Sequence, residues 1–124
     1  MNINATKNTP AVQFIPLTGT LLLSGSSMPE NALEFYRPII DWMRAHFATP
    51  GASLTLRMEL RYFNSSSMKS IFLLLETMRN AINNGGQGQV EWLVEDDDEF
   101  MLESGQTLME LLGMPLRFVN ERAA

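Results

Sequence analysis

Residues 56–75, LRMELRYFNSSSMKSIFLLL, change their hydrophobic periodicity at one point, and that point decides the fold. Apolar and polar side chains alternate up to Phe63, which is typical of a strand with one buried face. From Ser67 onwards the apolar residues recur every three or four positions, which is typical of an amphipathic helix. The run therefore predicts a strand, a tight serine-containing turn and a helix in immediate succession.

The predicted strand spans residues 53–63, and its alternation assigns each side chain to one of two faces. The predicted helix spans residues 67–83 and stops at a glycine-rich turn, which a further strand at residues 89–94 follows. A strand, a helix and a strand in this order make two parallel neighbours, with the helix covering one face of the sheet. In the first strand, the buried face would carry Leu54, Leu56, Met58, Leu60 and Tyr62, and the other face Thr55, Arg57, Glu59 and Arg61.

The first third of the chain predicts a hairpin and a helix. Two apolar stretches within residues 12–23 flank Thr18 and Gly19, which indicates two antiparallel strands. A helical pattern then runs from Leu33 to Phe47. Pro38 interrupts this pattern, and we expect it to kink the helix or to begin a second segment, because its ring clashes with the preceding turn.

The last third returns to helix and strand. Residues 97–112 predict a helix, and residues 116–119 predict an edge strand or a docked tail. We therefore expect an α/β protein with a small mixed sheet and helices packed on it. The length of 124 residues is that of one domain. We expect residues 11–124 to form it, after a flexible polar arm at residues 1–10.

Composition excludes several functional classes. The net charge of −5 disfavours nucleic acid and anionic membranes as partners, so a protein partner or a small ligand is expected. The chain has no cysteine, which removes disulfides, thiol catalysis and thiolate metal sites. No stretch has the apolar length or the flanks of a membrane span or a signal peptide. We expect a cytoplasmic protein.

The serines of the turn have two interpretations. A helix begins with backbone N–H groups that lack partners within the helix, so a serine oxygen at Ser65, Ser66 or Ser67 is well placed to cap it. The same N–H groups also favour a phosphate attached to serine, which would add about −1.5 to −2 charge units. The turn is therefore either a cap or a phosphorylation switch.

Five consecutive carboxylates at Glu95–Glu99, EDDDE, form the strongest electrostatic feature of the sequence. Carboxylates in the first turn of a helix complement its dipole, which is the first interpretation. A divalent-cation site is the second, although the spacing and the glycine of a calcium loop are missing. The third is a docking surface for a basic patch on a partner.

The sequence shows no catalytic constellation. His46 has no nucleophile or acid spaced near it, and we interpret it as a surface or structural histidine. The glycines at 85, 86 and 88 follow a helix and precede a strand, which is the reverse of a phosphate-binding loop. We expect no cofactor, no metal and no enzymatic activity. The alternatives are a small metal-dependent enzyme that uses the acidic run, or a purely structural subunit.

Four separated segments carry a family pattern: residues 28–31 (MPEN), 62–67 (YFNSSS), 98–105 (DEFMLESG) and 112–115 (LGMP). Lys69 after the serine turn and Trp92 in the predicted strand at residues 89–94 belong to the same pattern. In this order, over about residues 10–120, the chain resembles the SiaC family of bacterial regulatory phosphoproteins.

The resemblance implies a fold similar to STAS domains and a protein that is not an enzyme. It implies a serine/threonine kinase that phosphorylates the turn, a PP2C-type phosphatase that reverses this, and an unphosphorylated form that activates a diguanylate cyclase. The acceptor falls on Ser65, where the family usually has threonine, and Ser66 is the next candidate. Asn64, Ser65, Ser66, Ser67 and Lys69 are the expected partner-binding residues.

Overall fold

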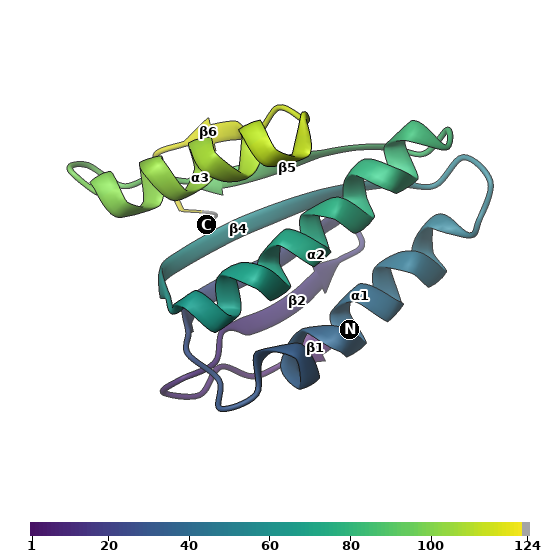
Figure 1. The fold of residues 1–124 in the computed structure, drawn as a ribbon. Coiled ribbons are helices and arrows are strands. Elements are labelled where there is room, and N and C mark those ends of the chain that lie inside the picture. Colours follow the sequence, from purple (N-terminus) through teal and green to yellow (C-terminus); the bar gives the residue numbers. More distant parts are fainter. Residues whose placement is uncertain (123–124) are drawn as a thin grey trace.

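The structure, a computed structural model, describes residues 1–122. Within them, the strands form one mixed sheet and the helices pack on it (Figure 1). The strands are β1 Asn2–Ile3, β2 Ala11–Ile15, β3 Thr20–Ser27, β4 Ser53–Phe63, β5 Gln87–Leu93 and β6 Arg117–Val119, and the helices are α1 Ala32–Phe47, α2 Ser65–Asn83 and α3 Glu99–Leu112.

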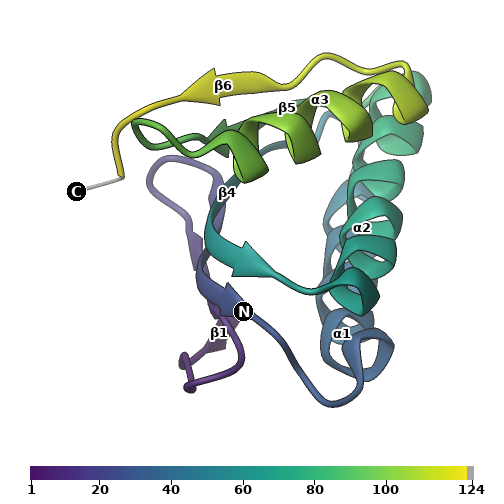
Figure 2. The ribbon, with the colours of Figure 1, turned by 60° about the vertical axis from the view of Figure 1, so that its left-hand side comes forward.

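The strands lie in the sheet in chain order, from β1 to β6. β2 runs antiparallel to β1 and β3, whereas β3, β4, β5 and β6 are parallel. Each parallel pair is joined through one helix. Such connections are right-handed, and from β3 to β6 each one moves to the next strand in the same direction, so all three helices lie on the same face of the sheet (Figure 2). The predicted single α/β domain, the hairpin, the strand–helix–strand unit and the C-terminal edge strand are confirmed.

The core lies between the sheet and the helices. Trp92 on β5 is its largest fully buried side chain, and its indole Nε1 donates to the carbonyl of Met101 at 2.9 Å. This bond fastens the first turn of α3 to the sheet, and Gly105 gives the helix room to approach the indole ring. Leu21, Leu23, Leu56, Met58 and Val90 fill the sheet side, and Tyr36, Ile39, Met43, Ile71, Leu74, Leu75, Met78 and Leu108 fill the helix side.

A β-bulge near the end of β4 overturns one sequence expectation. Gly25 on β3 pairs with Leu60, but the next residue, Ser26, pairs with Tyr62, so Arg61 is an extra residue in β4. A bulge reverses the alternation of faces from that point on. The prediction that Tyr62 lies on the buried face is therefore wrong: its side chain is 45% exposed, and Phe63 is buried instead.

Two helix predictions also need correction. α1 continues through Pro38 as one helix, with Pro38 on its exposed side, where water can bind the carbonyl group that the missing N–H leaves free. α2 begins at Ser65 and not at residue 67, because the side chain of Asn64 caps it.

The N-terminal arm is ordered in part as an edge strand. β1, which lies within the arm at residues 1–10, pairs with β2 through Asn2 and Gln13, and through Ile3 and Val12. The backbone N–H of Met28 also donates to the carbonyl of Asn8 at 2.7 Å. The arm is thereby joined to the sheet at both of these points.

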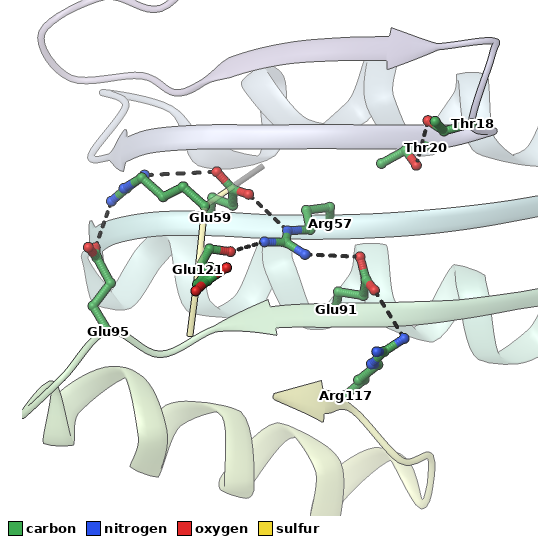
Figure 3. Close-up of polar contacts among 9 residues, drawn as sticks. Thr18, Thr20, Arg57, Glu59, Glu91, Glu95, Arg117 and Glu121 are labelled. Atoms are coloured by element: carbon green, nitrogen blue, oxygen red, sulfur yellow. Dashed lines mark hydrogen bonds and ion pairs between the residues drawn. The ribbon is translucent and has the colours of Figure 1, made fainter. Parts of the chain in front are cut away.

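The sheet face without helices carries a network of charged side chains (Figure 3). Arg57 on β4 contacts Glu59 at 2.8 Å and Glu91 on β5 at 3.3 Å. The C-terminal segment crosses this face, where the carbonyl of Glu121 accepts from Arg57 and the guanidinium of Arg122 lies 3.9 Å from Glu59. Glu59 is therefore only 3% exposed although it lies on the polar face of the strand. Within residues 1–122 no helix is long and apolar enough to cross a membrane.

Gly105→Ala should destabilise the protein. A Cβ atom at this position would lie 2.8 Å from Trp92 Nε1 and 2.7 Å from a ring carbon of Phe118. Overpacking of this kind costs about 1–3 kcal/mol, which exceeds the gain of about 1 kcal/mol from replacing glycine within a helix. Urea unfolding should give a lower midpoint than that of Gln106→Ala, an exposed neighbour that serves as control. Equal midpoints would contradict this packing.

Candidate functional site

The candidate site lies at the edge of the sheet where β3, β4 and β5 end. These parallel strands lead into α1, α2 and α3 respectively, so all three helices begin at this edge (Figure 1). Ligands of parallel sheets bind preferentially at the carboxyl ends of the strands. The segments 28–31, 62–67 and 98–105, which carry the family resemblance, all reach this edge.

Each of the three helices has an amide or carboxylate cap at this edge. A cap side chain accepts the backbone N–H three residues further on, which leaves the positive end of the helix dipole directed at the strand ends. The caps are Asn31, Asn64 and Asp98, which accept from the backbone N–H of Glu34, Ser67 and Met101 at 3.1, 3.0 and 3.0 Å.

The serine turn exposes two hydroxyl groups. Ser65 and Ser66 are the first two residues of α2, and both are exposed. The hydroxyl of Ser66 donates to Asn64 Oδ1 at 3.1 Å, whereas the hydroxyl of Ser65 makes no hydrogen bond within residues 1–122. The interpretation of the serines as the helix cap is wrong, since Asn64 has that role.

Ser67 is not on the surface. Its side chain is 0% exposed; its Oγ donates to the carbonyl of Ser27 at 2.9 Å and accepts from Ser27 Oγ at 3.0 Å. Ser27 Oγ lies 2.7 Å from the hydroxyl of Tyr36, so the network joins β3, α1 and α2. Burial raises the pKa of Tyr36 to about 12, although the hydrogen bond to Ser27 acts in the opposite direction. Ser67 therefore supports the turn from inside, where its buried side chain is not accessible to a partner.

Lys69 lies on the exposed side of α2, four residues after Ser65. Side chains four residues apart are neighbours on a helix surface. Among the described residues, the ammonium group of Lys69 belongs to no ion pair. It is therefore placed to pair with an anion at Ser65.

The acidic run divides into three parts. Asp98 caps α3, so the capping interpretation is confirmed for this residue. Glu95 pairs with Arg122 at 2.7 Å. Asp96, Asp97 and Glu99 are exposed and belong to no ion pair in the described part of the chain. No group of three or more potential ligand side chains converges on a metal position within residues 1–122.

His46 has a structural environment. Its Nε2 lies 2.7 Å from the carbonyl of Ser53, which accepts if that nitrogen carries the proton, and its ring stacks on Trp42 with centroids 5.2 Å apart. These contacts hold the end of α1 against the start of β4. The interpretation of His46 as a structural residue is confirmed.

Sequence reasoning missed an aromatic pair beside the serine turn. Tyr62 and Phe100, which are 45% and 43% exposed, stack with centroids 5.4 Å apart and an interplanar angle of 28°. The pair joins the end of β4 to the first turn of α3. Gly25, an isolated glycine within a strand, was the signal for the bulge that turns Tyr62 outwards.

Fold and site together define a class of protein: a single α/β domain with its helices on one sheet face and an exposed serine turn at the carboxyl edge. The sequence model of the SiaC family of regulatory phosphoproteins matches residues 3–121. The chain belongs to this family, as the sequence motifs predicted, and is a regulatory protein rather than an enzyme.

Known relatives agree over nearly the whole chain. Uncharacterized protein PA14_02130 of Pseudomonas aeruginosa (strain UCBPP-PA14) is 30% identical over 115 residues, which are 93% of this chain and 91% of the relative. The crystal structure of apo-SiaC from P. aeruginosa has a TM-score of 0.84 at 29% identity and covers 95% of this chain and 96% of its own. A crystal structure of the diguanylate cyclase SiaD in complex with its activator SiaC, from the same organism, has a TM-score of 0.88 at 28% identity. The match covers 98% of this chain and 99% of the matched chain.

Calcium or magnesium at millimolar concentration should leave the melting temperature nearly unchanged. The acidic side chains cap a helix, pair with arginine or point to solvent, so a divalent cation gains no preformed set of ligands. Differential scanning fluorimetry would measure this, with sodium chloride of equal ionic strength as the control. A saturable rise of several degrees with only the divalent cation would indicate a metal site.

Proposed function

We propose that this protein is a signalling phosphoprotein that is switched by reversible phosphorylation of Ser65. In the unphosphorylated form it binds and activates a diguanylate cyclase, and so controls cyclic-di-GMP signalling and biofilm formation. The observation that carries the proposal is the exposed hydroxyl of Ser65, which makes no hydrogen bond within residues 1–122 and lies at the positive end of α2. The structural likeness to SiaC, the activator of SiaD in P. aeruginosa, supports the choice of partner.

Ser65 is a better acceptor than Ser66 on the evidence of the hydrogen bonds. The hydroxyl of Ser66 donates to the capping oxygen of Asn64, so its phosphorylation would remove one bond from the cap. The hydroxyl of Ser65 can enter a kinase active site without breaking a bond within the described residues. This supports Ser65 as the substrate of a serine/threonine kinase and of the opposing PP2C-type phosphatase.

The fold can accommodate a phosphate at Ser65. The group would lie at the first position of α2, where the dipole and the N–H groups of the first turn favour an anion. Lys69, one turn further on, would pair with it. Phosphorylation would therefore change the charge of the surface and leave the core intact.

A partner that covers Ser65 would bind the two forms with different affinity. Transfer of a phosphate from water into a close-packed interface costs several kcal/mol unless the partner supplies matched cations, and about 1.4 kcal/mol is a factor of ten in the dissociation constant. Phosphorylation would then weaken binding by orders of magnitude without unfolding the protein. Asn64, Ser66 and Lys69 surround the acceptor and would contact the same partner.

Ser65→Ala should abolish phosphorylation and leave both folding and partner binding intact. Because Ser65 does not cap α2, we expect its free energy of unfolding to stay within about 0.5 kcal/mol of wild type. Asn64→Ala, which removes the cap, should lose about 1 kcal/mol. Phosphosite mapping of Ser65→Ala beside Ser66→Ala would assign the acceptor, and loss of phosphate only in Ser66→Ala would contradict it.

Ser65→Asp and the enzymatically phosphorylated protein should bind the cyclase more weakly than wild type or Ser65→Ala. The melting temperature should stay similar, because the helix dipole accepts the anion. Affinity can be measured by isothermal titration calorimetry and activation by the rate of cyclic-di-GMP synthesis. Equal affinity of all four forms would overturn the switch at Ser65. A parallel loss of affinity and stability would show that Ser65 serves the fold.

A further inference from the structure

We infer that Tyr62 and Phe100, with the exposed carboxylates of Asp96, Asp97 and Glu99 that precede Phe100 in the chain, form a docking surface for a protein segment that carries arginine or lysine next to an apolar side chain. We call these five residues the aromatic–acidic surface. The inference deepens the proposed function and rests on it in one respect, because it assigns the surface through which a partner would reach Ser65.

The backbone is shaped to expose the aromatic pair. Without the bulge at Arg61, regular alternation would turn Tyr62 towards the helices, where Leu56, Met58 and Leu60 lie. The bulge places the ring on the outside and lets it stack on Phe100. Bulges are frequent next to functional sites, where they redirect a side chain.

The pair is held in place from below. Phe100 also contacts the buried ring of Phe63 with centroids 5.1 Å apart, and Phe63 lies edge-on to Trp92 at 6.2 Å. The exposed rings therefore rest on a fixed aromatic support. Because these two side chains are already held in place, they would lose little conformational freedom when a partner packs on them, which favours tight binding.

The charge of the rim determines the chemistry of the partner. Asp96, Asp97 and Glu99 precede Phe100 directly, are exposed, and have no ion pair within residues 1–122. A guanidinium or ammonium group that packs on the two rings would be attracted by the rings and by these carboxylates, which lie within four residues of Phe100 in the chain. Arginine is the preferred residue in such an environment, and an apolar neighbour would cover the ring surface.

The position of the surface connects it to the switch. Tyr62 is three residues before Ser65, and the end of β4 lies between the start of α3 and the start of α2 at one end of the sheet (Figure 1). A segment that covers both rings therefore extends towards the serine turn. Leu17, which is 96% exposed, lies in the β2–β3 turn at the opposite edge and provides a matched control.

A library of random twelve-residue peptides, displayed on phage and selected on the wild-type protein, tests the surface without a cyclase. Selected peptides should be enriched in arginine or lysine next to an apolar residue. Their affinity, measured by fluorescence anisotropy, should fall at least tenfold for Tyr62→Ala and for Phe100→Ala, and should not change for Leu17→Ala. The combined variant Asp96→Asn, Asp97→Asn, Glu99→Gln should lose at least threefold and should show a weaker dependence on salt.

Circular dichroism and melting curves would show whether each variant is folded. If an alanine variant does not fold, the combined charge variant still tests the surface, because it keeps both rings. Three outcomes would overturn the inference: no peptide is selected, the selected peptides lack basic residues, or Tyr62→Ala and Phe100→Ala both bind the peptides with full affinity. If a cyclase binds the wild-type protein, its affinity should fall for the same variants. Failure of the Ser65 variants to alter cyclase binding would overturn the proposed switch alone, because the peptide selection does not depend on Ser65.

Discussion

The buried hydroxyl of Ser67 is the constraint on which the geometry of the site depends. It donates to the carbonyl of Ser27, while Ser27 Oγ contacts both Ser67 Oγ and the phenol of Tyr36. A buried hydroxyl without a partner costs about 1–3 kcal/mol, so the first turn of α2 cannot rotate without losing these bonds. Successive helix residues are about 100° apart, which directs Ser65 about 200° away from Ser67. Ser65 is exposed because Ser67 is fixed inside.

The sheet face opposite the helices carries a network of paired charges. Parallel sheets are normally covered on both faces, but here the helices cover only one. Arg57 pairs with both Glu59 and Glu91 on the other face, and Arg122 of the C-terminal segment adds a second positive charge beside Glu59. Removal of one member would leave a poorly solvated charge.

Periodicity was sufficient to predict every element except the two-residue strand β1, but it could not predict local departures from regular geometry. β4 has the predicted bounds, Ser53–Phe63, because apolar and polar residues alternate over ten positions, from Ser53 to Tyr62. Tyr62 was misassigned, since one extra residue in a strand does not change its composition. Pro38 was overestimated as a helix breaker, because its position on the solvent face was not considered. In contrast, the burial of Ser67 was predictable: it lies four residues before Ile71, on the apolar stripe of the helix.

A phosphate on Ser65 would have two opposing effects on the affinity for a basic partner. Their magnitudes decide whether binding becomes weaker or stronger. A phosphate on Ser65 would attract the cation that the acidic rim also attracts, but exposed ion pairs contribute only about 0–1 kcal/mol. The same phosphate beneath the apolar part of the segment would lose its hydration, at a cost of several kcal/mol. Lys69 offers the phosphate a counter-ion within the protein itself, which further reduces its attraction for the partner. Under the proposed switch, desolvation would therefore dominate, and an acidic protein would reject a basic partner when a phosphate adds about −1.5 to −2 charge units.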